Sequence, residues 1–224
     1  WATVRGHRVG DNPARWKGNL DMLLPKPSKV ARVVHHAALP YAEMGGFMAE
    51  LKKHSGMGAA ALRFAILTAT RSGEVRGATW AEIDAEASVW IIPAERMKAE
   101  KEHRVPLSPQ TLDLLRELPR LDGTEFLFPA SRKGQLSDMT LTAAIRRMGH
   151  SVTAHGFRST FRDWAAEQTA YPSEVVEMAL AHAIGNKVEA AYRRGDLFEK
   201  RRRLMADWAD YCDTPTATAG MVHP

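Results

Sequence analysis

Apolar residues recur at helical spacing along most of the chain. After Pro40, a residue type that suits the first turn of a helix, apolar side chains return every three or four residues as far as the Ser55–Gly56 pair. Ser108 followed by Pro109 forms an N-cap and first-turn pair that predicts another helix start. The predicted helices span residues 40–54, 59–70, 109–118, 137–148, 156–168, 173–181, 187–193 and 198–211.

The pattern changes between residues 88 and 108. Two short runs rich in β-branched and aromatic residues, "SVWIIPAE" and "HRVPLS", flank the polar stretch "RMKAEKE". This arrangement predicts an antiparallel hairpin within an otherwise helical chain. We therefore expect an α+β fold, mostly α-helical, with a small antiparallel β-sheet.

The two ends of the chain differ from its middle. Residues 1–30 are rich in Gly, Pro, Asn and basic residues, and we expect a linker with about one helical turn, the tail of an upstream domain. Residues 31–212 are expected to form one domain. Residues 213–224 are low in apolar bulk, and we expect a disordered tail.

Composition indicates a class of partner. The 224 residues carry a formal net charge of +5, and six basic residues fall between Arg193 and Arg203, a balance that favours an anionic partner such as nucleic acid. The single cysteine, Cys212, cannot form an internal disulfide, which fits a cytoplasmic protein. We see no signal peptide and no apolar run of the roughly 20 residues that a membrane span needs.

Four polar stretches contain residue types that could carry chemistry. They are "TRSGEVRGATW" with Arg71, "ERMKAEKEHRVPL" with Lys98, "TAHGFRSTF" with His155 and Arg158, and "LAHAIGNKVEAAYRR" with His182 and Tyr192. Taken singly, each has a plainer structural interpretation. Arg71 could be a cation at a helix C-terminus, Lys98 a solvated charge, and His182 a core histidine. Tyr192 could simply pack on Val188 one turn before it.

Taken together, these six residues are what metal-free attack on a phosphodiester requires. Two arginines can bind the non-bridging oxygens in bidentate fashion and stay charged at any working pH. A histidine exchanges protons near neutral pH, and a lysine on a loop can protonate the leaving 5′-oxygen. A tyrosine hydroxyl becomes a nucleophile beside arginines or a base. No metal ion or cofactor is needed.

The order Arg, Lys, His-x-x-Arg, His, Tyr resembles the catalytic domain of tyrosine recombinases. The local segments "PAERMK", "HRVPLS", "HGFRSTFRDWA" and "ADWADY" resemble prophage and genomic-island integrases more narrowly. The resemblance covers about residues 30–212. It implies the DNA breaking-rejoining fold and site-specific recombination in the bacterial nucleoid.

The resemblance also implies a role for each residue. Arg71 and Arg158 would clamp the scissile phosphate, with His182 as a further phosphate ligand. His155 would be a general base or a phosphate ligand, and Lys98 would protonate the leaving 5′-hydroxyl. Tyr192 would attack and form a 3′-phosphotyrosyl link. Glu74 would hold the region around the first arginine in place.

The implied partners are double-stranded DNA carrying an attachment-site core and other protomers in a DNA-bound tetramer of the full-length protein. Accessory DNA-bending or excision factors are compatible with this role, and no membrane partner is expected.

Several alternatives stay open at this stage. Lys101 lies in the same loop as Lys98 and could be the acid instead. The chain could be a DNA-binding module with an inactive site, or an enzyme like a type IB topoisomerase. A metal-dependent hydrolase would need ligands such as His35, His36 or His150, but their spacing matches no zinc motif.

Overall fold

The structure is a computed structural model that describes residues 1–25, 36–182 and 195–214. The chain divides into two compact units, Trp1–His35 and His36–Pro224. Within the first unit, a π-type turn η1 (Trp16–Leu20) leads into the single helical turn α1 (Asp21–Leu23). None of residues 1–25 is buried, so this part has no core of its own, as its Gly- and Pro-rich composition predicts.

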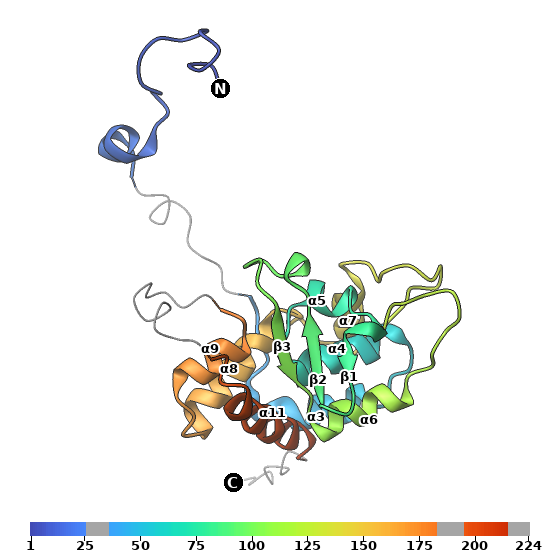
Figure 1. Cartoon of the computed structure of the whole chain (residues 1–224). Coiled ribbons are helices and arrows are strands. Elements are labelled where there is room, and N and C mark those ends of the chain that lie inside the picture. Colours follow the sequence, from blue (N-terminus) through green and yellow to red (C-terminus); the bar gives the residue numbers. More distant parts are fainter. Residues whose placement is uncertain (26–35, 183–194, 215–224) are drawn as a thin grey trace. The chain divides into compact units, whose positions relative to one another are not determined.

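The second unit contains the predicted helices (Figure 1). The 3₁₀ turn η2 (Tyr41–Glu43) leads into α3 (Met44–Leu51). The turn η3 (Trp80–Glu82) precedes the strands, and η4 (Ala94–Arg96) lies in the connection between the second and third strands. The other helices are α4 (Met57–Thr68), α5 (Ser72–Arg76), α6 (Pro109–Glu117), α7 (Thr140–Arg147), α8 (Gly156–Gln168), α9 (Ser173–Ala179) and α11 (Phe198–Asp213). The helix predicted at 187–193 and the tail 215–224 lie outside the described residues. No described helix is long and apolar enough to cross a bilayer.

A three-stranded antiparallel sheet interrupts the helices. Its order is β1 (Ile83–Asp84), β2 (Val89–Ile92) and β3 (His103–Pro106). Strands β2 and β3 pair with Val89 opposite Pro106 and Ile92 opposite His103, which confirms the predicted hairpin. Strand β1 was not predicted, because two residues are too short to show an alternating pattern.

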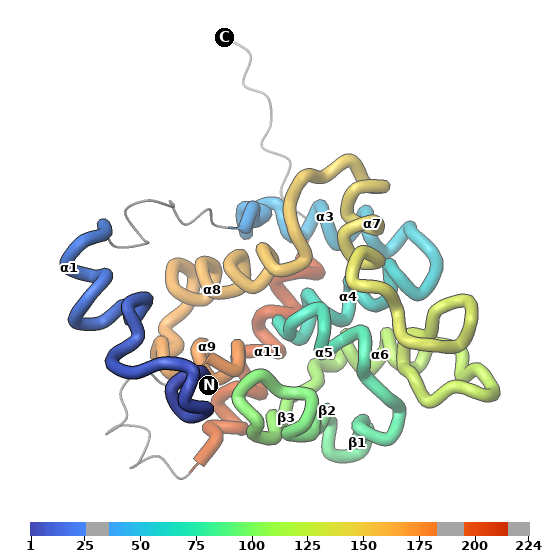
Figure 2. The backbone as a smooth tube through the Cα atoms, turned by 90° about the horizontal axis from the view of Figure 1, so that it is seen from above, coloured from blue at the N-terminus to red at the C-terminus, as the bar shows by residue number. Residues whose placement is uncertain are grey.

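Helix α4 lies at the centre of the core (Figure 2). It is apolar on nearly all sides, and Phe64 packs against Trp90 and Phe128 with ring centroids 5.1 and 5.4 Å apart. A helix that is apolar all round is typical of a buried position. The ends of α4 therefore lie in fixed places, and its C-terminal end leads directly into the residues around Arg71.

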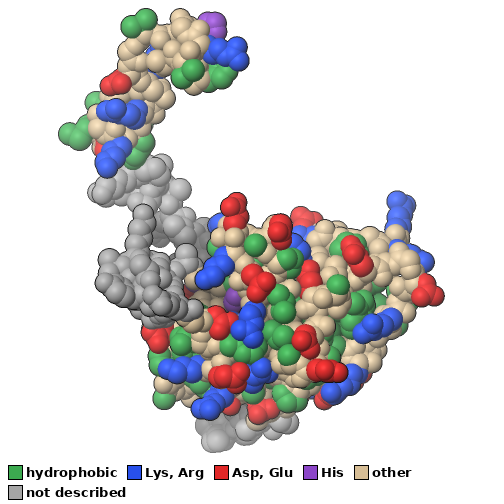
Figure 3. Space-filling view, viewed as in Figure 1, with side chains coloured by type: hydrophobic (Ala, Val, Ile, Leu, Met, Phe, Trp, Pro, Cys, Tyr) green, Lys and Arg blue, Asp and Glu red, His purple; other side chains and the backbone are tan. Residues whose placement is uncertain are grey.

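Helix α11 packs on the same core within the same chain. Trp208 is fully buried, and its indole nitrogen donates to the carbonyl oxygen of Ile66 on α4 at 2.8 Å. One basic residue of the 193–203 run differs from our expectation. Arg201 is 1% exposed, so its charge does not face solvent or a nucleic acid. Figure 3 shows acidic and basic side chains interspersed on the viewed face of this unit.

Candidate active site

Arg71 lies at the turn between two helices. Helix α4 ends at Thr68, Ala69 takes a left-handed conformation, and Arg71 then caps α5. The Glu74 carboxylate accepts a hydrogen bond from the Arg71 backbone nitrogen at 2.8 Å and from its Nη1 at 2.7 Å. Arg71 is therefore not the C-terminal cation of α4, and the expectation that Glu74 holds this region is confirmed.

Arg158 enters the site from the first turn of α8 and is only 4% exposed. Its Nη1 donates to the carbonyl oxygen of Ala69, and its Nη2 donates to that of Leu180, both at 2.6 Å. Ala69 and Leu180 are the C-cap residues of α4 and α9. The C-terminal end of a helix carries a partial negative charge and has carbonyl oxygens without a partner inside the helix, so it favours a cation. Burial, and then the charge of Arg71, lower the pKa of Arg158 to about 10, so the guanidinium stays charged at neutral pH.

The two arginines meet at the C-terminal end of α9. Arg158 binds the carbonyl of Leu180, and Arg71 Nη2 donates to the next carbonyl, that of Ala181, at 3.2 Å. Three elements that are distant in sequence thus converge here, namely the turn before α5, the start of α8 and the end of α9. The close approach of two cations creates a site that favours an anion.

His182 follows directly after these two carbonyls. Its Nε2 lies 3.2 Å from Arg158 Nη2, and its Nδ1 lies 2.5 Å from a carboxylate oxygen of Glu177. Because the guanidinium can only donate, we assign the ring proton to Nδ1, which donates to Glu177, and the lone pair to Nε2. The His182 side chain is 40% exposed, so the alternative of a core histidine is wrong.

Glu177 is a residue that the sequence reasoning missed. Its second carboxylate oxygen accepts from Arg162 Nε at 2.7 Å. Burial acts to raise the pKa of Glu177, but the hydrogen bonds from Arg162 and His182 outweigh it, and the pKa is lowered. Glu177 therefore stays ionised and orients the imidazole. No spacing in the sequence signals this pair, because residues five apart do not face each other on a helix, and His182 lies beyond the end of α9.

His155 stands at the entry to α8, and its side chain is exposed. The ring packs against that of His36 with centroids 4.6 Å apart. Gly156 makes this contact possible, because a Cβ there would lie 2.1 Å from the carbonyl oxygen of Ala37. Although the ring is accessible, its partial burial, followed by the charge of Arg158, lowers the pKa of His155, so the ring is neutral and able to accept a proton at pH 7.

Lys98 and Lys101 are both exposed in the connection between β2 and β3. Within the described ranges, neither amine takes part in a hydrogen bond or ion pair. The choice between the two lysines therefore stays open on geometry alone. Tyr192 lies outside the described residues, as do its neighbours Arg193 and Arg194.

His103, at the start of β3, is a second residue that sequence reasoning missed. Burial, and then the charge of Arg201, lower its pKa to about 4, and its Nε2 has no partner among the described residues. The ring is therefore neutral and adds no positive charge beside the arginines. Across the described residues, we find no group of three His, Cys, Asp or Glu side chains placed to hold a metal ion.

The fold is that of the catalytic domain of tyrosine recombinases. The integrase from mycobacterium phage Brujita superposes with a TM-score of 0.61 at 18% identity, covering 98% of this chain and 70% of that one. A lambda integrase (75–356) dimer bound to a COC′ core site gives a TM-score of 0.57 at 17% identity, covering 87% of this chain and 69% of that one.

Sequence comparison shows the family. Residues 39–197 match the phage integrase family, and the chain belongs to it. The integrase of Enterobacteria phage P4 is 36% identical over 232 residues, covering 94% of this chain and 51% of that protein. The prophage integrase IntA of Escherichia coli K12 is 42% identical over 150 residues, covering 65% of this chain and 36% of that protein. The chain thus spans about half of the length of the first relative and about a third of the second.

Proposed function

We propose that this chain is the catalytic part of a tyrosine site-specific recombinase that cuts and rejoins DNA through a 3′-phosphotyrosine intermediate. The observation that carries the proposal is the convergence of Arg71, Arg158 and His182 at the end of α9. In this proposal residues 31–212 form the catalytic domain, and residues 1–30 link it to an upstream DNA-binding part.

The arginine pair supplies charge for a phosphate. Phosphoryl transfer depends mainly on positioning and charge stabilisation, and two fixed guanidinium groups provide both without a metal ion. Arg158 Nε is buried and donates to no described residue. A buried donor without a partner is costly, so an arriving phosphate oxygen would stabilise the site.

In the proposed reaction, the Tyr192 oxygen attacks phosphorus and the bond to the 5′-oxygen breaks. The tyrosine proton passes to the neutral His155 ring, while Lys98 donates a proton to the leaving oxygen. Arg71 and Arg158 bind the non-bridging oxygens, and His182 joins them once its Nε2 carries a proton, because a phosphate oxygen can only accept a hydrogen bond. A 5′-hydroxyl of a partner strand then attacks the phosphotyrosine and restores a phosphodiester, so the energy of the bond is retained.

The other three of the chain's four tyrosines are poorly suited to this role. The hydroxyl of Tyr41 donates to Glu167 at 2.7 Å, and this hydrogen bond raises its pKa. Burial and a hydrogen bond to Asp207 raise the pKa of Tyr171 to about 12. Burial also raises the pKa of Tyr211. A raised pKa disfavours the phenolate, which supports Tyr192 as the nucleophile.

We propose double-stranded DNA with an attachment-site core as the substrate, and further protomers of the full-length protein as partners. The solved lambda integrase tetramer bound to a Holliday junction, which has the same fold at a TM-score of 0.57, supports this arrangement. Accessory DNA-bending or excision factors would act on such an assembly, in the bacterial nucleoid.

A nicked suicide substrate tests the proposal. The protein is incubated with duplex DNA that carries its attachment core and a nick next to the scissile phosphate, and adducts are resolved under denaturing conditions. We expect an adduct with wild type and with Tyr171→Phe, none with Tyr192→Phe, and no effect of EDTA. No adduct on the correct core would contradict recombinase activity. Relaxation of plasmids without any core would instead favour a topoisomerase.

A further inference from the structure

Arg96 lies two residues before Lys98, at the end of the 3₁₀ turn η4. Its guanidinium bridges two elements of the fold. Nη1 forms an ion pair with the carboxylate of Glu82, and Nη2 donates to the backbone carbonyl of Glu74 on α5. The Arg96 side chain is 23% exposed, so these contacts are shielded from most of the solvent.

Both acceptors are held in place themselves. The Glu82 carboxylate also accepts from the indole nitrogen of Trp90 at 2.8 Å, and Trp90 is fully buried. The carboxylate of Glu74 binds Arg71 at 2.7 and 2.8 Å, while its carbonyl binds Arg96. One buried residue, Glu74, therefore connects the phosphate-binding arginine to the loop that carries the lysines.

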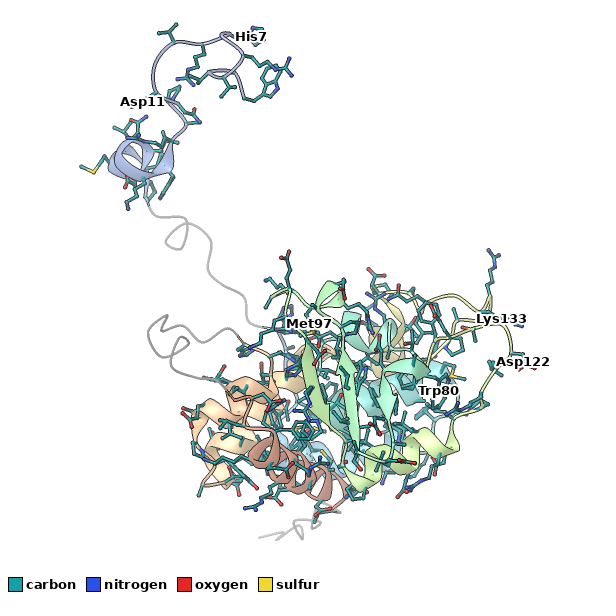
Figure 4. All side chains as sticks on the ribbon, in the orientation of Figure 1. His7, Asp11, Trp80, Met97, Asp122 and Lys133 are labelled. Carbon is teal, nitrogen blue, oxygen red and sulfur yellow. The ribbon has the colours of Figure 1, made fainter. Side chains whose placement is uncertain are left out.

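The guanidinium of Arg96 also packs closely against the backbone of α5. A Cβ at Gly77, the residue that ends α5, would lie 3.0 Å from Arg96 Nη2 and 3.1 Å from Gln135 Nε2. Beyond Arg96, Met97 follows directly after η4 and is 5% exposed (Figure 4). The next residue, Lys98, is exposed. The loop is thus anchored up to residue 97 and becomes accessible at Lys98.

We infer that Arg96 is a positioning residue that holds Lys98 at the leaving 5′-oxygen of the phosphate bound by Arg71. This inference rests on the proposed function. An arginine is needed because its planar fork reaches the Glu82 carboxylate and the Glu74 carbonyl at once, which the single ammonium group of lysine does not. Arg96 itself touches neither DNA nor the reacting atoms in this account.

The chemistry of the leaving group separates this role from a purely structural one. During cleavage the bond between phosphorus and the 5′-oxygen breaks, and a proton from the Lys98 ammonium moves to that oxygen. If sulfur replaces the 5′-oxygen, the leaving thiolate belongs to a thiol with a pKa of about 8.5, against ~15.7 for water, and needs no proton. A defect confined to the acid therefore disappears on the sulfur substrate.

The experiment compares single-turnover cleavage of two suicide substrates that differ only in oxygen or sulfur at the scissile 5′-position. General acid catalysis contributes about 10²–10⁴-fold, so we expect Arg96→Gln to slow cleavage of the oxygen substrate by about 10- to 100-fold. On the sulfur substrate it should be within about threefold of wild type. Lys98→Ala should show the same rescue, and Arg71→Ala should show none.

Thermal unfolding shows whether Arg96→Gln folds, and a second variant tests the inference if it does not. Gly77→Ala keeps every charge but crowds the Arg96 guanidinium, and it should give a smaller defect that sulfur also rescues. The inference is overturned if Arg96→Gln and Gly77→Ala slow cleavage of the oxygen and sulfur substrates equally. It is also overturned if both variants cleave the oxygen substrate at the wild-type rate. If wild type forms the adduct but Lys98→Ala is not rescued, the inference fails while recombinase activity stands. If wild type forms no adduct, the proposed function fails.

Discussion

The buried Arg201 of α11 gives a prediction whose size can be worked from the structure. Its Nη1 donates to the carbonyl of Arg104 on β3 at 2.6 Å, and its Nε donates to the carbonyl of Asp196 at 2.7 Å. Nη2 pairs with the Asp196 carboxylate at 2.8 Å, but that side chain is 41% exposed and its charge is largely screened. We therefore count only the two carbonyls.

Arg201→Met keeps most of the side-chain volume but removes every donor. Each lost charge-assisted hydrogen bond costs about 1.5 kcal/mol or more, so the free energy of unfolding should fall by about 3 kcal/mol. For a domain of this size, that loss corresponds to a decrease in Tm of about 6–12 °C. We expect Arg201→Met to reduce DNA cleavage as well as stability, because its partner Asp196 lies four residues after Tyr192 in the sequence.

Urea unfolding monitored by tryptophan fluorescence measures this loss. Arg203→Met is the matched control, because Arg203 lies on the same helix and is exposed. The control should change the free energy of unfolding by no more than about 0.5 kcal/mol. A loss below about 1 kcal/mol for Arg201→Met, or one equal to that of the control, would refute the reasoning.

Three further predictions concern single groups of the site. Burial, and then the charge of Arg201, lower the pKa of His103 to about 4. Between about pH 4 and pH 6.5 the unfolded chain therefore binds more protons than the folded one, and the free energy of unfolding falls as the pH drops through this range. His103→Gln should therefore lose about 2 kcal/mol less than wild type between pH 7 and pH 5, and equal losses in urea unfolding would contradict this. Lys98→Ala should slow single-turnover cleavage by at least about 10²-fold while Lys101→Ala stays within about threefold, and the reverse order would make Lys101 the acid. Glu177→Gln should reduce cleavage about tenfold by weakening the hold on the His182 ring, and a rate within about twofold of wild type would show that this carboxylate does not orient it.

Local patterns predicted most of the fold. Ser108 caps α6 as expected, with its hydroxyl 3.3 Å from the backbone nitrogen of Thr111, and α8 spans the predicted residues Gly156–Gln168. Caps and helical periodicity depend on neighbours within a few residues, so the sequence carries them directly. Strand β1 depends on its pairing with β2, which no local pattern shows.

The residue types of the site could be named from sequence, but not their partners. Arg158 binds carbonyls 89 and 22 residues away, and these acceptors belong to the backbone, which carries no sequence signal. Arg201 lies within the basic run that we took to favour an anionic partner, yet it is buried, since charge counting does not distinguish the two faces of an amphipathic helix. The partners of Arg158 and the burial of Arg201 depend on tertiary packing, which local sequence patterns do not show.

The most direct test of the central claim is the identity of the atom that becomes linked to DNA. Trypsin digestion of the adduct from a suicide substrate should yield the peptide of residues 188–193, followed by mass spectrometry of the attached nucleotide. The account predicts a nucleotide joined through its 3′-phosphate to the hydroxyl oxygen of Tyr192. A link to Tyr41, Tyr171 or Tyr211, or a link through a 5′-phosphate, would contradict it.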